Sequence, residues 1–149
     1  MKGTTNIIIR EAGRDDIPEL VGLMDQLGYP TSEEEMIVRF EAIGRHPDYA
    51  CFVASCNETV AGMIGLIRSY AFERNGVYVR VGALVVHESY RKHGIGKLLM
   101  KKAEDWAQQQ GAGMIVLTSR NIEERLAAHA LYKKMGYKKA SSGFKKMLD

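Results

Sequence analysis

Two glycines stand where an apolar run gives way to a segment with helical spacing. The run Leu84–Val86 leads through a short polar stretch to Gly94 and Gly96, and apolar residues then recur with the period of an α-helix. The first N–H groups of a helix have no partner inside it and lie at the positive end of its dipole, so they can hold a phosphate. Glycine has no Cβ atom and lets such a ligand approach closely. The pattern indicates anion binding, and a tight turn without a ligand is the alternative that these residues alone leave open.

Two common phosphate motifs do not fit this stretch. The P-loop requires Ser or Thr after its Gly-Lys pair, but Leu98 follows Gly96 and Lys97. The dinucleotide-binding fingerprint requires a third glycine, and Leu99 occupies that position. If the turn binds a phosphate, it belongs neither to the P-loop class nor to the dinucleotide-binding class.

Two segments together carry a resemblance to a known family. The residues Arg91-Lys92-His93-Gly94-Ile95-Gly96 match the pattern Arg/Gln-x-x-Gly-x-Gly/Ala, which follows a strand in the GNAT superfamily of N-acetyltransferases. Residues 128–137 match the pattern Ala-x-x-Leu/Phe-Tyr-x-x-x-Gly-Phe/Tyr of that family's penultimate helix. The joint occurrence is much more specific than either match. The chain resembles a GNAT acetyltransferase in its order of elements too, from the strand at Ile7 to Phe144.

The resemblance implies acetyl-CoA as cosubstrate and a position for it. Its pyrophosphate would lie on the backbone amides of the turn, and its pantetheine arm would pair with the preceding strand. The binding residues implied in this way are Leu84, Val85 and Val86 in the strand, and Arg91, Lys92, His93, Gly94, Ile95, Gly96 and Lys97 in the turn. Gly82 would mark the bulge that admits the coenzyme, since glycine in a strand often marks a bulge, although a packing gap is the alternative.

The resemblance also implies catalytic roles. An amine must be neutral to attack a thioester, whereas a lysine-type amine has a pKa of about 10.4. Tyr132 matches the family tyrosine that protonates the leaving thiolate; the alternative is an aromatic residue on a half-buried helix face. The base is open, because strand residues 77–86 contain no carboxylate where family members often carry glutamate. Glu73 in the preceding turn is the candidate, with a water relay or capture of a neutral amine as alternatives. A backbone N–H near Val85 or Val86 would hold the developing oxyanion.

Two further regions bear on the substrates. Arg125 stands where many family members have an asparagine that touches the pantetheine arm, so it either contacts phosphates or faces solvent. The acceptor is expected to enter over residues 25–31 and the acidic Glu33–Glu35. Carboxylates there could attract a cationic amine, but acidic residues are favoured at a helix start in any case.

The elements that must position these residues follow from periodicity and turn signals. Strands are predicted at residues 6–11, 50–55, 60–70, 77–86 and 114–118, with a final strand or hairpin at 137–147; helices are predicted at 15–27, 32–44, 94–110 and 123–135. The central strands should form an antiparallel meander, and the strands flanking the long helix need a crossover. The expected class is α/β, or α+β by a stricter label. It is the GNAT fold, a mixed, mostly antiparallel sheet of about six to seven strands flanked by four helices.

Size and composition agree with one domain over residues 1–149. Hydrophobic residues make up 46% and charged residues 26%, which excludes disordered and fibrous classes. No apolar run approaches the ~18 residues of a membrane span and the start lacks a signal peptide, so a cytoplasmic location is expected. The net charge of +3 is dispersed, and the lysines near the end are expected to form a solvated face rather than a nucleic-acid site.

Cysteine and histidine usage point to a reducing compartment and no metal. Cys51 and Cys56 are five apart in a predicted strand, too far for an unstrained disulfide, and are expected to be free buried thiols. The four histidines show no zinc-ligand spacing.

The leading hypothesis is an acetyl-CoA-dependent N-acetyltransferase that acts on a primary amine of a small molecule or protein by direct attack in a ternary complex. One alternative is a non-catalytic acetyl-CoA-binding or sensory module, which has no need of Tyr132. Another is an acyltransferase with a different acyl donor or a hydroxyl acceptor. A homodimer through residues 137–148 is also expected, because late strands offer an exposed edge.

Overall fold

The computed structural model describes residues 6–117, 126–139 and 144–148, and the chain divides into two compact units, Met1–Thr118 and Ser119–Asp149. The first unit holds the sheet. Its strands are β1 (Ile7–Glu11), β2 (Tyr49–Cys56), β3 (Thr59–Tyr70), β4 (Val77–Val86) and β5 (Ile115–Leu117). They lie in sequence order, with β1 to β4 antiparallel and β5 parallel to β4. The predicted meander and the crossover between β4 and β5 are confirmed.

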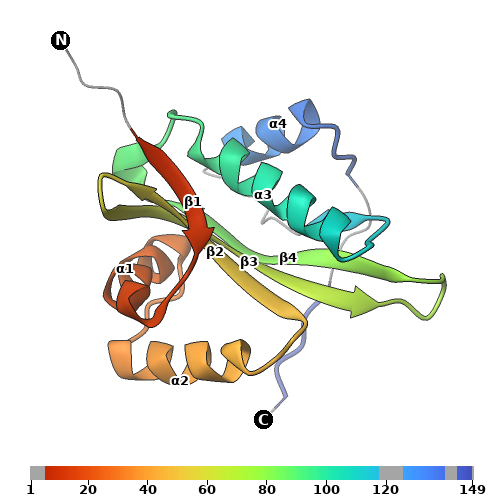
Figure 1. Ribbon diagram of the computed structural model, residues 1–149, viewed down its shortest axis with the longest axis horizontal. Coiled ribbons are helices and arrows are strands. Elements are labelled where there is room, and N and C mark those ends of the chain that lie inside the picture. Colours follow the sequence, from red (N-terminus) through yellow and green to blue (C-terminus); the bar gives the residue numbers. More distant parts are fainter. Residues whose placement is uncertain (1–5, 118–125, 140–143, 149) are drawn as a thin grey trace. The chain divides into compact units, whose positions relative to one another are not determined.

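Helices cover both faces of this sheet. The helix α1 (Ile17–Leu27), which follows the 3-10 turn η1 (Arg14–Asp16), and the helix α2 (Glu33–Gly44) lie on one face, and α3 (Ile95–Gln109) lies on the other (Figure 1). A second 3-10 turn, η2 (Glu88–Tyr90), stands between β4 and α3. The sheet is therefore the middle layer, and β4 leads through η2 to the turn that opens α3.

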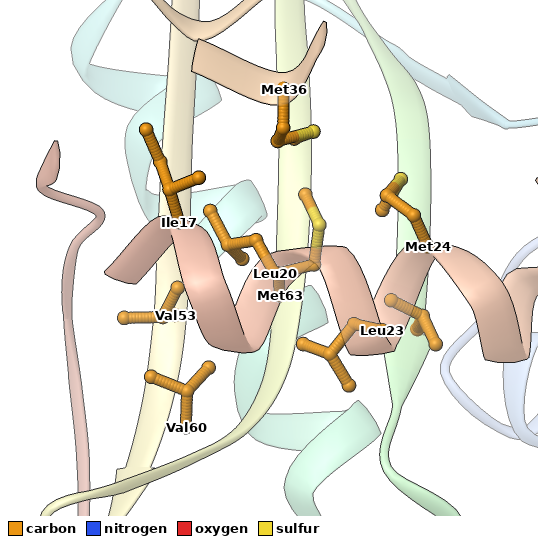
Figure 2. Packing of buried hydrophobic residues seen from close by; sticks show 9 residues of the cluster. Ile17, Leu20, Leu23, Met24, Met36, Val53, Val60 and Met63 are labelled. Carbon is orange, nitrogen blue, oxygen red and sulfur yellow. The ribbon is translucent and has the colours of Figure 1, made fainter. Parts of the chain in front are cut away.

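Apolar side chains join α1 and α2 to the sheet. The cluster comprises Ile17, Leu20, Leu23, Met24, Met36, Val53, Val60, Met63 and Val85 (Figure 2). Leu20 is fully buried and Leu23 nearly so, since helical spacing places both on the face of α1 that meets the strands. Burying a side chain of this kind contributes roughly 1.5–3 kcal/mol. This packing fixes α1 against β3 and β4.

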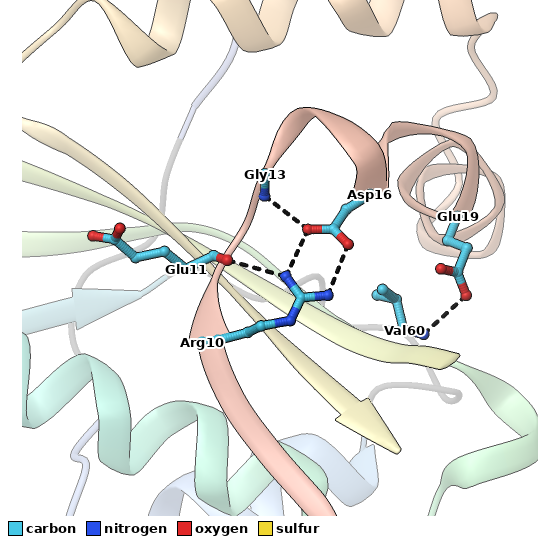
Figure 3. Close-up of polar contacts among 6 residues, drawn as sticks. All are labelled: Arg10, Glu11, Gly13, Asp16, Glu19 and Val60. Carbon is cyan, nitrogen blue, oxygen red and sulfur yellow. Dashed lines mark hydrogen bonds and ion pairs between the residues drawn. The ribbon is translucent and has the colours of Figure 1, made fainter. Parts of the chain in front are cut away.

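A polar network holds the start of α1. Both terminal nitrogens of Arg10 donate to the carboxylate of Asp16 at 2.9 Å, and the N–H of Gly13 donates to the same carboxylate at 2.7 Å (Figure 3). Glu19, one turn further on, accepts a 2.9 Å hydrogen bond from the N–H of Val60. The bonds from Arg10 and Gly13 hold the pKa of Asp16 below its ordinary value.

The second unit contributes one described helix, α4 (Leu126–Lys134), which ends before Gly136 with its φ of +95°. The predicted final strand is wrong for residues 137–139 and 144–148, which form no strand, while residues 140–143 lie outside the described part. The described residues hold five strands instead of the expected six to seven. The sequence of residues 137–148 is rich in lysine and contains a glycine, and it lacks the continuous apolar pattern of the five strands.

Candidate functional site

The strand β4 carries a bulge at Gly82. Ala83 pairs with Gly65 and Val81 pairs with Leu66 on β3, so Gly82 is an extra residue in β4. A Cβ atom at Gly82 would lie 3.3 Å from the side chain of Ile67, a tight contact. The bulge predicted from the glycine is therefore confirmed.

The bulge reverses which backbone groups of β4 face β5. Before it, the N–H of Val79 donates to the carbonyl of Met114 at 3.0 Å, so alternate residues from Val79 direct their polar groups to β5. After it, the N–H of His87 donates to Ala61 on β3 at 2.7 Å. By the two-residue alternation of a strand, Leu84 and Val86 direct their N–H and C=O groups away from β3.

These backbone groups lie on an open edge within the described part of the chain. The pairing of β4 with β5 runs from Val79 to Val81 and is not described beyond that point. Leu84 and Val86 therefore offer strand-type donors and acceptors to a third extended group. Of the three strand residues expected to bind pantetheine, Val85 directs its backbone to β3 instead, and its side chain is buried.

The turn after β4 has an unusual backbone. Lys92 has φ of +69° and Gly94 has φ of +80°, both left-handed, and such a conformation in a non-glycine residue is uncommon and concentrates at functional sites. Leu98 donates to the carbonyl of Gly94 at 3.0 Å, the first bond of α3. The amides of residues 95–97 precede it and have no partner within the helix.

Charge at this turn favours an anion. Arg91, Lys92, His93 and Lys97 are exposed, and the first turn of α3 contains no acidic residue. The Nε of Arg91 also donates to the carbonyl of Val86 at 3.3 Å. A guanidinium thus lies beside both the open strand edge and the helix start.

A glycine on β3 lets α3 approach the sheet. A Cβ atom at Gly62 would lie 3.0 Å from the carbonyl of Val85 and 3.2 Å from side-chain atoms of both Ile95 and Leu99. Ile95 and Leu99 are buried, so the first two turns of α3 pack directly against β3 and β4. The sequence analysis did not single out Gly62; the available signal was a glycine inside a predicted strand, which does not say which element approaches it.

Glu73, Tyr132 and Arg125 are the other residues for which the sequence predicts a role. Glu73 is exposed in the loop joining β3 to β4, and the five strand steps from Val77 to Gly82 span about 16 Å, so it lies at the far end of the hairpin from the bulge. Tyr132 lies on α4, edge-on to Tyr137 with ring centroids 6.4 Å apart. Arg125 lies outside the described residues.

On the expected acceptor side, one of the three glutamates has a structural role. Ser32 caps α2: its Oγ accepts from the N–H of Glu35 at 3.1 Å, and the Glu35 carboxylate accepts from the N–H of Ser32 at 3.3 Å and from the hydroxyl of Thr31 at 3.0 Å. The bond from the Ser32 backbone holds the pKa of Glu35 below its ordinary value. Glu35 is thus engaged in the cap.

Neither the described thiols nor the described acidic and histidine residues form another reactive centre. Burial raises the pKa of Cys51 to about 12 and also raises that of Cys56, so both free thiols stay protonated at neutral pH. Residues 6–117, 126–139 and 144–148 contain no group of three His, Cys, Asp or Glu side chains able to hold a metal, and absence of a metal stays a prediction. None of the helices in these ranges has the length and apolarity to cross a bilayer.

The model of the Acetyltransferase (GNAT) family matches residues 17–137, which include β4, the turn and α4. The chain belongs to the GNAT family. An uncharacterized N-acetyltransferase of Bacillus subtilis, YhdJ, is 28% identical to this GNAT chain over 134 residues, which cover 89% of the chain and 92% of that protein. Human N-acetyltransferase 8 is 32% identical over 96 residues, 64% of the chain and 41% of its own length. Family membership and these relatives support acyl transfer.

Solved structures agree with the GNAT fold. A GNAT family acetyltransferase of Staphylococcus aureus superposes with a TM-score of 0.81 at 31% identity, covering 95% of this chain and 98% of that one. The aminoglycoside acetyltransferase AAC(6')-Iy, solved in complex with a bisubstrate analogue of CoA, superposes with a TM-score of 0.81 over 97% of this chain and 99% of its own. Its 16% identity supports the fold alone. The expected fold class and family are confirmed.

Proposed function

We propose that the chain is an acetyl-CoA-dependent N-acetyltransferase that acetylates a primary amine. The observation that carries this proposal is the bulge at Gly82, which turns the polar groups of Leu84 and Val86 to an edge that no described strand occupies, just before the turn at Gly94. An extended amide-containing arm needs strand-type partners, and a pyrophosphate needs unpaired N–H groups and positive charge. The chain offers both within one continuous segment.

The residues present fit the coenzyme by shape as well. A Cβ atom at Gly94 would meet no protein atom within 4 Å, so the space beside that backbone is open to a ligand. The amides of residues 95–97 would hold the pyrophosphate, with Arg91, Lys92 and Lys97 supplying positive charge. Leu84 and Val86 would pair with the two amides of the pantetheine arm.

The reaction requires one bond to form and one to break. The amine nitrogen bonds to the acetyl carbonyl carbon, the C–S bond breaks, and the sulfur leaves as thiolate. We assign Tyr132 as the acid that gives this thiolate a proton, since a phenol with pKa near 10 is protonated at neutral pH. The N–H of Val86, on the open side of β4, suits the developing oxyanion better than that of Val85, which faces β3.

The incoming amine can become neutral and lose its proton by three routes: through Glu73, through a water relay, or by selection of an amine that is already neutral. Direct proton transfer to Glu73 requires the amine nitrogen to lie within hydrogen-bond reach of its carboxylate, whereas the loop that carries Glu73 lies about 16 Å from the bulge. A water relay or selection of the neutral amine removes that requirement. A profile of kcat/KM against pH for Glu73→Gln separates these routes, because only direct catalysis by Glu73 ties the acidic limb, where activity rises as the base loses its proton, to that side chain.

An acyl-donor and acceptor panel tests the function. The protein is incubated with acetyl-, propionyl- and succinyl-CoA and with small amines, amine-bearing peptides and alcohols, and products are identified by mass spectrometry. We expect acetylated amines. Transfer of another acyl group or to a hydroxyl would assign the alternative transferase, and coenzyme binding without any product would favour the sensory module.

A further inference from the structure

The side chain of Gln26 joins the last turn of α1 to the segment before α3. The Oε1 atom of Gln26 accepts a 2.9 Å hydrogen bond from the N–H of Glu88, 62 residues further along the chain. The amides on either side of Glu88 find their acceptors near β4: His87 donates to Ala61, and Ser89 donates to Nδ1 of His87 at 3.1 Å. The N–H of Glu88 is therefore satisfied from a different element.

This bond joins the segment over which the acceptor is expected to enter to the segment that leads into the proposed coenzyme turn. Gln26 lies two residues before Gly28, whose φ of +104° ends α1 and begins the connection to Ser32, on the expected acceptor side. Glu88 lies three residues before Arg91, where the proposed coenzyme turn begins. The rest of α1 is fixed by Leu23 and Met24, which are buried against the sheet. Gln26 thus connects a fixed helix to the segment just before the coenzyme turn.

We propose that Gln26 is a positioning residue that couples coenzyme binding to order in residues 28–32, an inference that rests on the proposed function. A ligand that holds the turn restricts the N–H of Glu88, which in turn restricts Gln26 and the chain leaving α1. If the segment is ordered before its own ligand arrives, less conformational entropy is lost when that ligand binds. Since coupling is reciprocal, an ordered acceptor segment also strengthens coenzyme binding.

Hydrogen exchange of the full chain, with and without acetyl-CoA, measures the coupling. In the parent protein, acetyl-CoA slows exchange of the amides at residues 94–97. It also slows exchange at residues 28–32, read at Gly28, Tyr29, Thr31 and Ser32 because Pro30 has no N–H, by about two- to tenfold, the range that one hydrogen bond supports. Gln26→Leu removes the acceptor and abolishes the second effect while the first persists. Gln26→Glu keeps an acceptor oxygen and restores the second effect. The matched control is Gln109→Leu, the same change at an exposed position of α3.

A second variant removes the donor, in case Gln26→Leu does not fold. Glu88→Pro lacks the N–H and suits the first position of η2, because His87 before it is already extended, with ψ of 134°. Glu88→Ala keeps the N–H and is its control. Glu88→Pro combined with Gln26→Leu should lose no more protection at residues 28–32 than either change alone.

The outcomes separate this coupling from the proposed function. Protection at residues 94–97 with unchanged exchange at residues 28–32 in the parent protein would overturn the coupling and leave the function standing. Retained protection at residues 28–32 in both Gln26→Leu and Glu88→Pro would do the same. Absence of protection at residues 94–97 would overturn the proposed function and the coupling together.

Discussion

The Nε of Arg91 donates a hydrogen bond of 3.3 Å to the carbonyl of Val86, joining the turn before α3 to the open edge of β4. Arg91 is exposed, so its guanidinium can also reach a ligand on the turn. We expect Arg91→Leu to weaken acetyl-CoA binding by about tenfold, since a hydrogen bond to a charged group contributes about 1.5–3 kcal/mol before solvent screening. Calorimetry at two salt concentrations measures this. Arg91→Gln should lose less, and equal affinity of parent and Arg91→Leu would remove the side chain from the site.

Gly96→Ala should raise the stability of the protein and lower its affinity for the coenzyme. Gly96 lies in the first turn of α3, where alanine stabilises a helix by roughly 0.5–1 kcal/mol relative to glycine. A Cβ atom near the phosphates should nevertheless weaken coenzyme binding. The matched control is Gly22→Ala in α1, where an added Cβ meets nothing within 4 Å: it should raise stability and leave affinity unchanged. Thermal melts and calorimetry on both variants decide, and unchanged affinity of Gly96→Ala would limit Gly96 to turn chemistry.

Tyr132 should matter for turnover more than for binding. Removing its hydroxyl in Tyr132→Phe should lower kcat by roughly a hundred- to ten-thousandfold, the range for one positioned general acid. Acetyl-CoA affinity should hardly change, because backbone groups elsewhere hold the coenzyme. The loss should shrink with an acetyl donor whose leaving group is more acidic than a thiol. Steady-state kinetics on an amine found in the panel test this, and equal turnover of Tyr132→Phe and parent would refute the assignment.

The pair between Arg10 and Asp16 should give pH-dependent stability. The pKa of Asp16 is lower in the folded state than in the unfolded chain, so the stabilisation is present above the unfolded value of about 3.9 and is lost as pH falls through the folded value. Asp16→Asn should therefore destabilise by about 1–3 kcal/mol at pH 7, and the difference should shrink below about pH 4. Denaturant unfolding at both pH values measures it. Glu41→Gln, which breaks the exposed pair with Arg14, should cost under about 1 kcal/mol; an equal loss in both variants would contradict the role given to Asp16.

Local patterns in the sequence were sufficient for most of the fold. The period of apolar residues located α1 and α3 to within a few residues, and the glycine in β4 located the bulge, because both signals arise within one element. The glycine turn and the family pattern located the candidate coenzyme segment for the same reason.

Contacts between distant segments were not predictable in the same way. The close approach of α3 to Gly62 and the bond between Gln26 and Glu88 depend on how elements pack, which no local pattern records. The direction of the Val85 backbone, towards β3, was not predictable either, because the bulge reverses the parity of the strand and the sequence alone does not fix that parity. The prediction of a final strand or hairpin over residues 137–147 rested on a weak local pattern, because residues 137–139 and 144–148 carry little of the apolar alternation that a strand needs.

The central claim is that the segment from β4 into α3 binds acetyl-CoA through its backbone. Titration of the labelled protein with acetyl-CoA, followed by amide NMR, tests it most directly because it gives affinity and location together. We predict saturable shifts concentrated at Leu84, Val86 and residues 94–97, with a Kd roughly between low micromolar and sub-millimolar and a raised Tm. No shifts at about 1 mM acetyl-CoA, or shifts confined to other parts of the chain, would contradict the claim.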